Sequence, residues 1–353
     1  MTINDKHTKR AFVMSILILA LAFVSCAART QAIKGPKSIA SLEKVNIGGV
    51  EQWLLIRGYD TSNPVLLFLH GGPGVTEMPM AHDAWPEIEK KFVLVHWDQR
   101  GAGKSYHRGI PLDTMNVKQF ISDTHEVVEL LRKRFGVTKI YLVGHSWGSQ
   151  LGIQVAQKYP ELFYAFVSIG QVVNPTQGET ITYQFVMDEA VKRQNKRAIR
   201  QLKQIGPPPY YTNNKFFILG WWMNKFGGVA YNKKHDYPHS FLRSLTSKEY
   251  NFMDLFRLYR GMLFSLKYMK DELLTFNAFE QIPRIEVPVY FLVGRHDYNT
   301  PWILVEKYYK ILDAPKGKTL IWFDNSAHML PFEEPEKFSD VMINRVLAET
   351  YIE

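Results

Sequence analysis

The chain has 353 residues, of which 46% are hydrophobic and 22% are charged. This composition is ordinary for a folded globular protein and excludes a disordered or low-complexity chain. Its 43 Lys and Arg outnumber its 34 Asp and Glu, which gives a formal net charge of +9. No nucleic-acid-binding module is visible, so we expect no nucleic-acid partner. The length suits one large domain with an insertion, or two modest domains.

The N-terminus has the pattern of an export signal. Lys6, Lys9 and Arg10 precede the apolar run "AFVMSILILALAFVS" at 11–25, an arrangement typical of a signal peptide or a short membrane anchor. Cys26, the only cysteine of the chain, follows directly. Its position resembles the lipobox of bacterial lipoproteins, which implies a lipid-modified Cys26; an uncleaved anchor is the alternative. We expect residues 1–26 to tether an exported, bacterial protein to a membrane, outside the cytoplasm.

Residues 27–40 are predicted to form a short tether. Two strand-like runs follow in "KVNIGGVEQWLLIRGY", and the Gly48–Gly49 pair between them predicts a hairpin. Six further runs are almost continuously apolar, as expected for strands that are covered on both faces of a sheet. In chain order they are "PVLLFLHGG", "KFVLVHWDQ", "KIYLVGHS", "LFYAFVSIG", "PVYFLVGRHD" and "GKTLIWFDN".

Helical patterns lie between these strands, for example "NVKQFISDTHEVVELLRKRFG". Alternating strands and helices predict an α/β fold with a doubly wound, mostly parallel sheet. The alternation stops once, because residues 172–281 contain no strong strand. We therefore expect a core of residues 41–171 and 282–353, with residues 172–281 inserted as a mainly helical cap. The cap is rich in aromatic side chains, including Tyr210, Tyr211, Trp221, Trp222, Tyr231 and Phe241. Most of them are expected in its own core, and a few are expected to line an apolar substrate pocket at the domain interface.

The segment "IYLVGHSWGSQLG" at 140–152 places Ser146 between an expected strand and an expected helix. Its G-x-S-x-G pattern is typical of a nucleophile elbow, in which glycines leave room for a sharp backbone turn. The turn lifts the serine hydroxyl above the sheet, and the first N–H groups of the helix face the charge that develops beside it. Ser146 is therefore the candidate nucleophile.

Other strand ends carry further candidate groups, because ligands of such sheets bind beyond the carboxyl ends of the strands. The glycine-rich "HGGPG", residues 70–74, exposes backbone N–H groups that could bind an oxyanion. The charged turn "DQRGAGKS" is expected to support this first loop. Asp297 ends one strand and His328 follows the last one. With Ser146 they appear in the order Ser, Asp, His, in which a base takes the serine proton and an acid orients the base.

The segments "HGGPG", "DQRGAGKS" and "GHSWGSQLG" resemble the signature segments of the proline iminopeptidase branch of the α/β-hydrolases. The resemblance covers about residues 45–171 and 282–353, and it implies the α/β-hydrolase fold for the core. It also implies roles for particular residues, namely a triad of Ser146, Asp297 and His328, and an oxyanion hole from the N–H groups of Trp147 and Gly72, with Gly71 as the weaker choice.

The chain also departs from that branch. His145 stands where the branch usually has glycine, and "SIGQVVNP" differs from the usual segment after this strand. Members of the branch hold the amino group of the substrate with cap carboxylates, and no carboxylate aligns clearly here. Substrate-binding residues therefore stay unassigned, and the candidates are Glu179, Asp188, Glu189, Asp271 and Glu272.

Together these residues predict a serine hydrolase that forms an acyl-enzyme on a small amide or ester, with an aminopeptidase-like activity favoured. An acyl or carboxyl esterase, or a lipase-like hydrolase, is the alternative within this class. A surface-tethered binding protein without turnover is the alternative of another class, but it would have no physical need for the elbow, the glycine loop and the triad together. His125 and Glu129 lack a third ligand, so we expect no metal, and we expect no cofactor.

Overall fold

The computed structural model describes residues 28–210, 213–231, 235 and 237–351. The predicted export segment 1–26, including Cys26, lies outside the described residues. Within the described part of the chain, no helix combines the length and the apolar character needed to cross a membrane.

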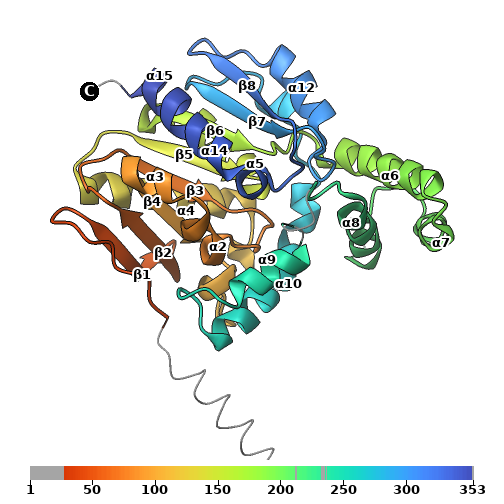
Figure 1. Ribbon diagram of the computed structural model, residues 1–353, viewed down its shortest axis with the longest axis horizontal. Coiled ribbons are helices and arrows are strands. Elements are labelled where there is room, and N and C mark those ends of the chain that lie inside the picture. Colours follow the sequence, from red (N-terminus) through yellow and green to blue (C-terminus); the bar gives the residue numbers. More distant parts are fainter. Residues whose placement is uncertain (1–27, 211–212, 232–234, 236, 352–353) are drawn as a thin grey trace, which may run out of the picture.

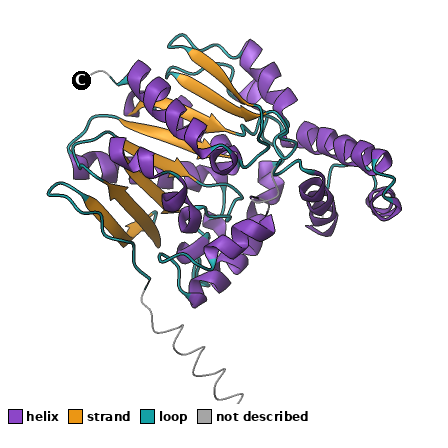
Figure 2. Cartoon of the chain, viewed as in Figure 1, coloured by secondary structure: helices purple, strands orange, loops and turns teal. Residues whose placement is uncertain are grey.

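The strands form one sheet with helices packed around it (Figure 2). The sheet has eight strands in the order β1-β2-β4-β3-β5-β6-β7-β8. β1 pairs antiparallel with β2, and β2 with β4, whereas all other neighbours are parallel. The predicted hairpin and the six predicted apolar strands are all confirmed. Their bounds are Ile39–Ile47 (β1), Val50–Gly58 (β2), Val65–Leu69 (β3), Val93–Asp98 (β4), Ile140–His145 (β5), Phe163–Ile169 (β6), Val289–Gly294 (β7) and Lys318–Phe323 (β8).

The segment before β1 is shorter and better anchored than the predicted tether of residues 27–40. β1 already begins at Ile39. Further upstream, Arg57 Nη1 donates to the Thr30 hydroxyl at 2.5 Å and to the Gln31 carbonyl at 2.7 Å. The same guanidinium donates from Nε to the Glu89 carboxylate at 2.7 Å. With the Arg29 N–H bonded to the Lys248 carbonyl, the chain is bound to the body of the protein from Arg29 onward.

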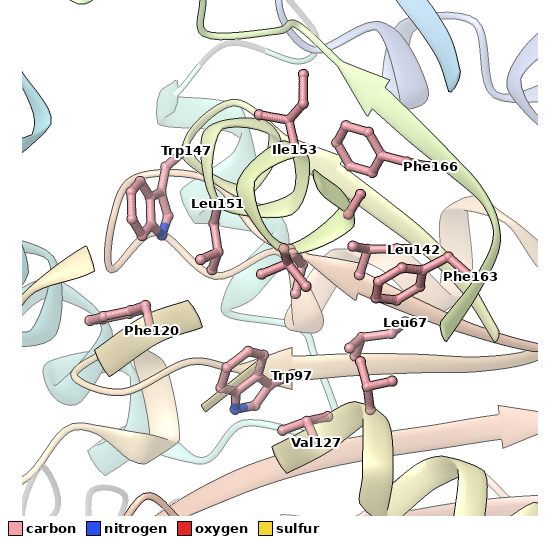
Figure 3. Close-up of a cluster of buried hydrophobic side chains, with 14 of the residues drawn as sticks. Leu67, Trp97, Phe120, Val127, Leu142, Trp147, Leu151, Ile153, Phe163 and Phe166 are labelled. Carbon is pink, nitrogen blue, oxygen red and sulfur yellow. The ribbon is translucent and has the colours of Figure 1, made fainter. Parts of the chain in front are cut away.

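Buried side chains fill both faces of the central strands. Along β3, Leu67 and Leu69 belong to one core cluster, while Leu66 and Phe68 belong to another, because successive side chains of a strand point to opposite faces. Figure 3 shows the first cluster, to which the strands contribute Leu67, Leu142 and Phe163, and α4 and α5 contribute Phe120, Val127, Trp147, Leu151 and Ile153. This first face is covered by α4 (Val117–Phe135), α5 (Trp147–Lys158) and α12 (Trp302–Ile311), and the second by α3 (Pro86–Lys91) and α14 (Pro335–Asp340).

Short elements complete the core. They are the helices α2 (Met78–Ala84), α13 (Leu330–Glu333) and α15 (Ala348–Thr350), the 3₁₀ turns Gly103–Ser105, Leu112–Thr114 and Pro160–Leu162, and a π-helical segment, Val341–Leu347.

Between β6 and β7 the described residues form helices and connecting loops but no strand, which confirms the helical insertion. The helices are α6 (Pro175–Lys192), α7 (Lys196–Ile205), α8 (Asn213–Phe226), α9 (Tyr237–Ser244), α10 (Phe252–Leu273) and α11 (Ala278–Gln281). Figure 1 shows α6, α7 and α8 extending from one side of the sheet. In contrast, α10 packs on the core at the turn that follows β4.

The aromatic side chains of the cap divide between its interior and its surface. Tyr210 and Trp222 are buried, as expected, but Trp221 and Tyr231 are more than half exposed. The side chains of Tyr211 and Phe241 lie outside the described residues. Trp221 and Trp222 differ because neighbouring residues of a helix point about 100° apart, so only one of them can face the interior.

Candidate active site

Ser146 lies on a sharp turn between the end of β5 and the start of α5. Its backbone has φ 56° and ψ −120°, a conformation that residues with a side chain rarely adopt. The Ser146 N–H donates to the Ile169 carbonyl of β6 at 2.9 Å, which holds the turn against the sheet. The serine therefore stands at the carboxyl end of a central strand.

The two glycines of the elbow are required by close backbone approach. A Cβ on Gly144 would overlap the carbonyl oxygen of Gly148, and a Cβ on Gly148 would overlap the carbonyl oxygen of Leu69. Any larger residue would push α5 away from β5 or from β3. The glycines thus allow the helix to begin directly above the strands, which fixes the position of Ser146.

Asp297 and His328 meet beyond the carboxyl ends of the strands β7 and β8. Nδ1 of His328 lies 2.9 Å from Oδ2 of Asp297, and both side chains are almost fully buried. Because an ionised carboxylate only accepts hydrogen bonds, Nδ1 carries a proton in this contact and Nε2 is left as the acceptor nitrogen. This is the tautomer that a general base for a serine needs.

The Asp297 carboxylate is held by three donors. The N–H groups of Asn299 and Thr300 donate to Oδ1 at 2.8 and 2.9 Å, and the Thr300 hydroxyl donates to Oδ2 at 2.8 Å. Thr300 had not been predicted as a site residue. On the other side, a Cβ on Gly170 would come within 2.9 Å of Nδ1 of His328, so the glycine leaves the space that the imidazole occupies.

The glycine-rich loop after β3 passes beside Ser146. A Cβ on Gly71 would lie 3.2 Å from the Cβ of Ser146 and 3.7 Å from its Oγ. The next residue, Gly72, has φ +112°, which glycine adopts without strain. Trp147 is the first residue of α5, and the first N–H groups of a helix have no acceptor within it. The loop and the helix start thus bring backbone amides close to the serine.

His70 and Gln99 determine the path of this loop. Nδ1 of His70 lies 2.8 Å from the Gly71 carbonyl oxygen, and Nε2 accepts from the Gln99 N–H at 3.2 Å. Burial lowers the pKa of His70 to about 4, so the ring is neutral near pH 7, as these two contacts require. Gln99 also accepts from Nε1 of Trp147 at 2.9 Å. The charged turn after β4 therefore supports the first loop, as predicted.

The same turn joins the cap to the core. Asp98 accepts from the Thr76 hydroxyl at 2.5 Å, from the Lys104 N–H at 2.7 Å and from the hydroxyl of Tyr250 in the cap. Burial raises the pKa of Asp98 to about 6, although these donors oppose the change. Nζ of Lys104 lies 2.5 Å from Oδ2 of Asp254 on α10, and both side chains are buried.

His145, the departure noted in the elbow, forms a buried pair with Glu77. Its Nδ1 lies 2.5 Å from Oε1 of Glu77, and its Nε2 lies 2.9 Å from the backbone carbonyl oxygen of His328. Burial disfavours the charged ring, but the Glu77 carboxylate, the His328 carbonyl and the charge of Asp297 together raise the pKa of His145. The sequence carried no signal for Glu77, because it lies 68 positions from its partner.

A cap segment also contacts both loops that carry the predicted acid and base. The Val229 carbonyl accepts from the N–H groups of His328 and Met329 at 2.9 and 3.1 Å, and the Gly228 carbonyl accepts from the Tyr298 N–H at 3.1 Å. Tyr298 directly follows Asp297. These bonds fix the backbone on both sides of the Asp297–His328 contact.

The five candidate cap carboxylates lie in different surroundings. Three have structural partners, since Asp188 accepts from Gln184, Glu189 pairs with Arg193, and Glu272 accepts from the Val117 N–H. Asp271 is exposed. Glu179 is half-buried and accepts from the Tyr210 N–H at 3.2 Å.

His125 and Glu129 face each other on α4, with Nε2 and Oε1 4.0 Å apart. Within the described ranges, no group of three or more His, Cys, Asp or Glu side chains is arranged to hold a metal ion.

Comparison with known proteins places the chain among hydrolases. The family model described as the alpha/beta hydrolase fold matches residues 64–201. The probable aminopeptidase YbaC of Bacillus subtilis is 37% identical over 306 residues, which cover 87% of this chain and 96% of that protein. The chain belongs to the α/β-hydrolase family. The resemblance stated from the three sequence segments is thereby confirmed, and the chain is an enzyme, a serine hydrolase of this fold.

Further relatives of this α/β-hydrolase agree with that placement. The proline iminopeptidase of Saccharolobus solfataricus is 28% identical over 291 residues, or 80% of this chain and 84% of that protein. Among solved structures, VinJ has a TM-score of 0.62 at 21% identity, with 87% of this chain and 98% of VinJ covered. The proline iminopeptidase-related protein TTHA1809 from Thermus thermophilus has a TM-score of 0.52 at 20% identity, covering 88% and 98%. At these identities the structural likeness shows the fold alone.

Proposed function

We propose that Ser146, His328 and Asp297 are the nucleophile, the general base and the orienting acid of this serine hydrolase. The observation that carries the proposal is the 2.9 Å contact between Nδ1 of His328 and Oδ2 of Asp297, at the sheet edge where Ser146 occupies the elbow. The N–H groups of Gly72 and Trp147 are the proposed oxyanion hole, because the loop and the helix start lie beside the serine.

The reaction then has two halves. Ser146 Oγ attacks the carbonyl carbon of the substrate while its proton passes to Nε2 of His328, and the oxyanion is bound by the two N–H groups. The C–N or C–O bond breaks, and the leaving amine or alcohol takes the proton from Nε2. Water next gives a proton to Nε2 and displaces the acyl group from Ser146, whose oxygen recovers that proton. Asp297 stays ionised and stabilises the imidazolium.

The favoured substrate class is an N-terminal aminoacyl amide, as the names of the relatives and the three motifs suggest. The free amino group of such a substrate is a cation and needs a carboxylate partner. Glu179 is our candidate, because it is half-buried and, among the described residues, has no ion-pair partner within 4 Å. Burial raises the pKa of Glu179, against the opposing effects of the Tyr210 N–H and Lys270. A substrate ammonium would relieve this cost of burial.

A substrate panel tests the nucleophile and the substrate class together. Ser146 should react with a fluorophosphonate probe, and Ser146→Ala should lose the labelling and at least about 10³-fold in turnover. N-acetylation of an aminoacyl-arylamide should lower kcat/KM by roughly 10- to 150-fold, since a charge-assisted hydrogen bond is worth about 1.5–3 kcal/mol. Glu179→Gln should remove most of that discrimination, whereas the matched Glu189→Gln should keep it.

Equal rates on free and N-acetylated substrates would contradict the aminopeptidase proposal and favour an acyl esterase. In that case, longer acyl chains should gain about 0.8 kcal/mol per buried CH₂ until the pocket is filled. A folded wild-type protein that does not react with the probe would instead overturn the assignment of Ser146.

We also propose that the enzyme is exported and tethered to a membrane through residues 1–26, with Cys26 as the lipid-modified residue. The support is the basic stretch, the apolar run at 11–25 and the cysteine that follows it. Mass spectrometry of the N-terminal peptide from membrane fractions should find a chain that begins at a lipidated Cys26. An unmodified peptide that includes the apolar run would identify an uncleaved anchor instead.

A further inference from the structure

We infer that the outer face of α10 is a docking surface for an anionic phospholipid bilayer. The inference rests on the proposed N-terminal tether and not on the hydrolase chemistry. It concerns the described residues of the cap next to the place where the chain enters the fold.

The outer face of α10 is apolar and aromatic. Phe252, Met253, Phe256 and Tyr259 are 45%, 50%, 54% and 57% exposed. Phe252, Phe256 and Tyr259 share one side of the helix, because they are spaced four and three residues apart. The opposite side is buried on the protein. Soluble monomers rarely leave such contiguous apolar surface in water unless it has a partner.

The charges around this face select an anionic partner. Between residues 242 and 268 the exposed charged side chains are all basic, namely Arg243, Lys248, Arg257, Arg260 and Lys267. The two acids of this stretch, Glu249 and Asp254, are buried. A second copy docked by two-fold symmetry would bring these cations together. An anionic lipid surface instead accepts the aromatic rings between its headgroups and attracts the Lys and Arg around them.

The position of the N-terminus brings this face to the membrane. The Arg29 N–H donates to the Lys248 carbonyl at 2.9 Å, and Nζ of Lys248 donates to Oε1 of Gln31 at 3.0 Å. The N-terminal chain therefore joins the fold at Lys248, which is four residues before Phe252. This is the side of the molecule where α10 lies (Figure 1). The apolar run ends at Ser25, and four residues reach at most about 14 Å. A tethered enzyme thus holds Arg29, which is bonded to Lys248 just before α10, within that distance of the lipid.

Photo-crosslinking of the full-length protein tests the surface. The photoreactive residue p-benzoylphenylalanine replaces Phe256, or, as a control, Ile311, which is 60% exposed on α12. The protein is reconstituted with vesicles of phosphatidylglycerol and phosphatidylcholine. Lipid adducts should form at position 256 with at least about five times the yield at position 311. The yield at 256 should fall when phosphatidylcholine alone is used, because each basic side chain near an anionic surface contributes about a fivefold change in affinity.

Charge reversal separates this face from the general basic charge of the protein. Arg260→Glu with Lys267→Glu should lower the adduct yield at position 256 at least about fivefold. The matched pair Arg200→Glu with Lys203→Glu, on the exposed side of α7, makes the same change in net charge and should lower it less than twofold. Turnover of a soluble substrate should not change in either variant.

Flotation of the vesicles distinguishes failure of the surface from failure of the tether. Protein that floats with the vesicles but gives equal yields at 256 and 311 would overturn the docking surface and leave the tether standing. Adducts at 256 to a second protein copy would also overturn it, in favour of self-association. Protein that does not float at all would overturn the tether and the docking surface together, while the hydrolase proposal is unaffected.

Discussion

The buried pair of His145 and Glu77 allows a sharp prediction about stability. Both ring nitrogens of His145 face oxygen atoms, Oε1 of Glu77 at 2.5 Å and the His328 carbonyl at 2.9 Å, so we expect both to carry protons and the ring to be cationic. The second carboxylate oxygen of Glu77, Oε2, is buried and has no hydrogen-bond partner among the described residues. Loss of the imidazolium would therefore leave the negative charge of the buried Glu77 carboxylate without a positive partner.

We expect His145→Gln and Glu77→Gln each to lower the free energy of unfolding by about 3–5 kcal/mol at pH 6, the cost of breaking a buried ion pair. The double variant should lose less than the sum of the two, by at least about 1 kcal/mol, because it leaves no unpaired charge. Urea unfolding measures all three. The matched control removes the exposed pair of Arg284 and Glu286 and should cost less than about 1 kcal/mol.

The pH dependence of this effect has a definite sign. Because the pKa of His145 is raised in the folded state, its contribution is complete below the ordinary histidine pKa of about 6.5. It is then lost as the pH rises through the folded-state value. The difference in stability between wild type and His145→Gln should therefore shrink from pH 6 toward pH 9. A difference that is constant over this range, or that grows, would refute the account of a buried imidazolium.

Three other substitutions test the geometry of the site. Gly148→Ala should destabilise the protein by about 3 kcal/mol, measured by urea unfolding, because its Cβ would overlap the Leu69 carbonyl. Gly170→Ala should lower kcat/KM about 10²-fold in the fraction that stays folded, because the new Cβ displaces the His328 imidazole. The pKa of the buried, neutral His70 is lowered to about 4, so the stability of wild type relative to His70→Gln should fall by up to about 3 kcal/mol as the pH drops from 6.5 to 4, measured by urea unfolding of both proteins.

The sheet was predictable because each strand is a short apolar run that is covered on both faces. The elbow was predictable for a similar reason, since close backbone approach at Gly144 and Gly148 admits only glycine. That Asp297 and His328 would meet followed from topology, because parallel strands bring their carboxyl ends to one edge. The strands and the elbow were thus predicted from local sequence patterns, and the meeting of Asp297 and His328 from the general rules of sheet topology.

The supporting contacts were not predictable, because their partners are far apart in the chain. Glu77 meets His145 across 68 positions, and Lys104 meets Asp254 across 150. Such pairs form only when the loops and the cap helices pack on the core. In the sequence, a charged residue that will be buried looks the same as one that will be exposed, because its partner is not a neighbour in the chain.

The same reasoning explains why the surface of the cap was misjudged. Helices such as α8 and α10 carry apolar residues on nearly all sides, so the pattern predicts a helix without saying which side is covered. Trp221 and Trp222 are equivalent in the sequence, yet one is exposed and the other buried. Sequence reasoning assigned most of these aromatics to a cap core, and the exposed ones became visible only when the packing was known.

The contacts of the cap change how its role in the site is understood. The Val229 carbonyl accepts from the His328 N–H, and the Gly228 carbonyl accepts from the N–H of Tyr298, the residue after Asp297. The cap therefore helps to fix the positions of the proposed base and acid relative to each other. At its other end, Tyr250 and Asp254 bind the turn that supports the glycine loop. The cap therefore fixes two loops of the site. A shift of Gly228 or Val229 would therefore reach Tyr298 and His328 through hydrogen bonds that are already formed.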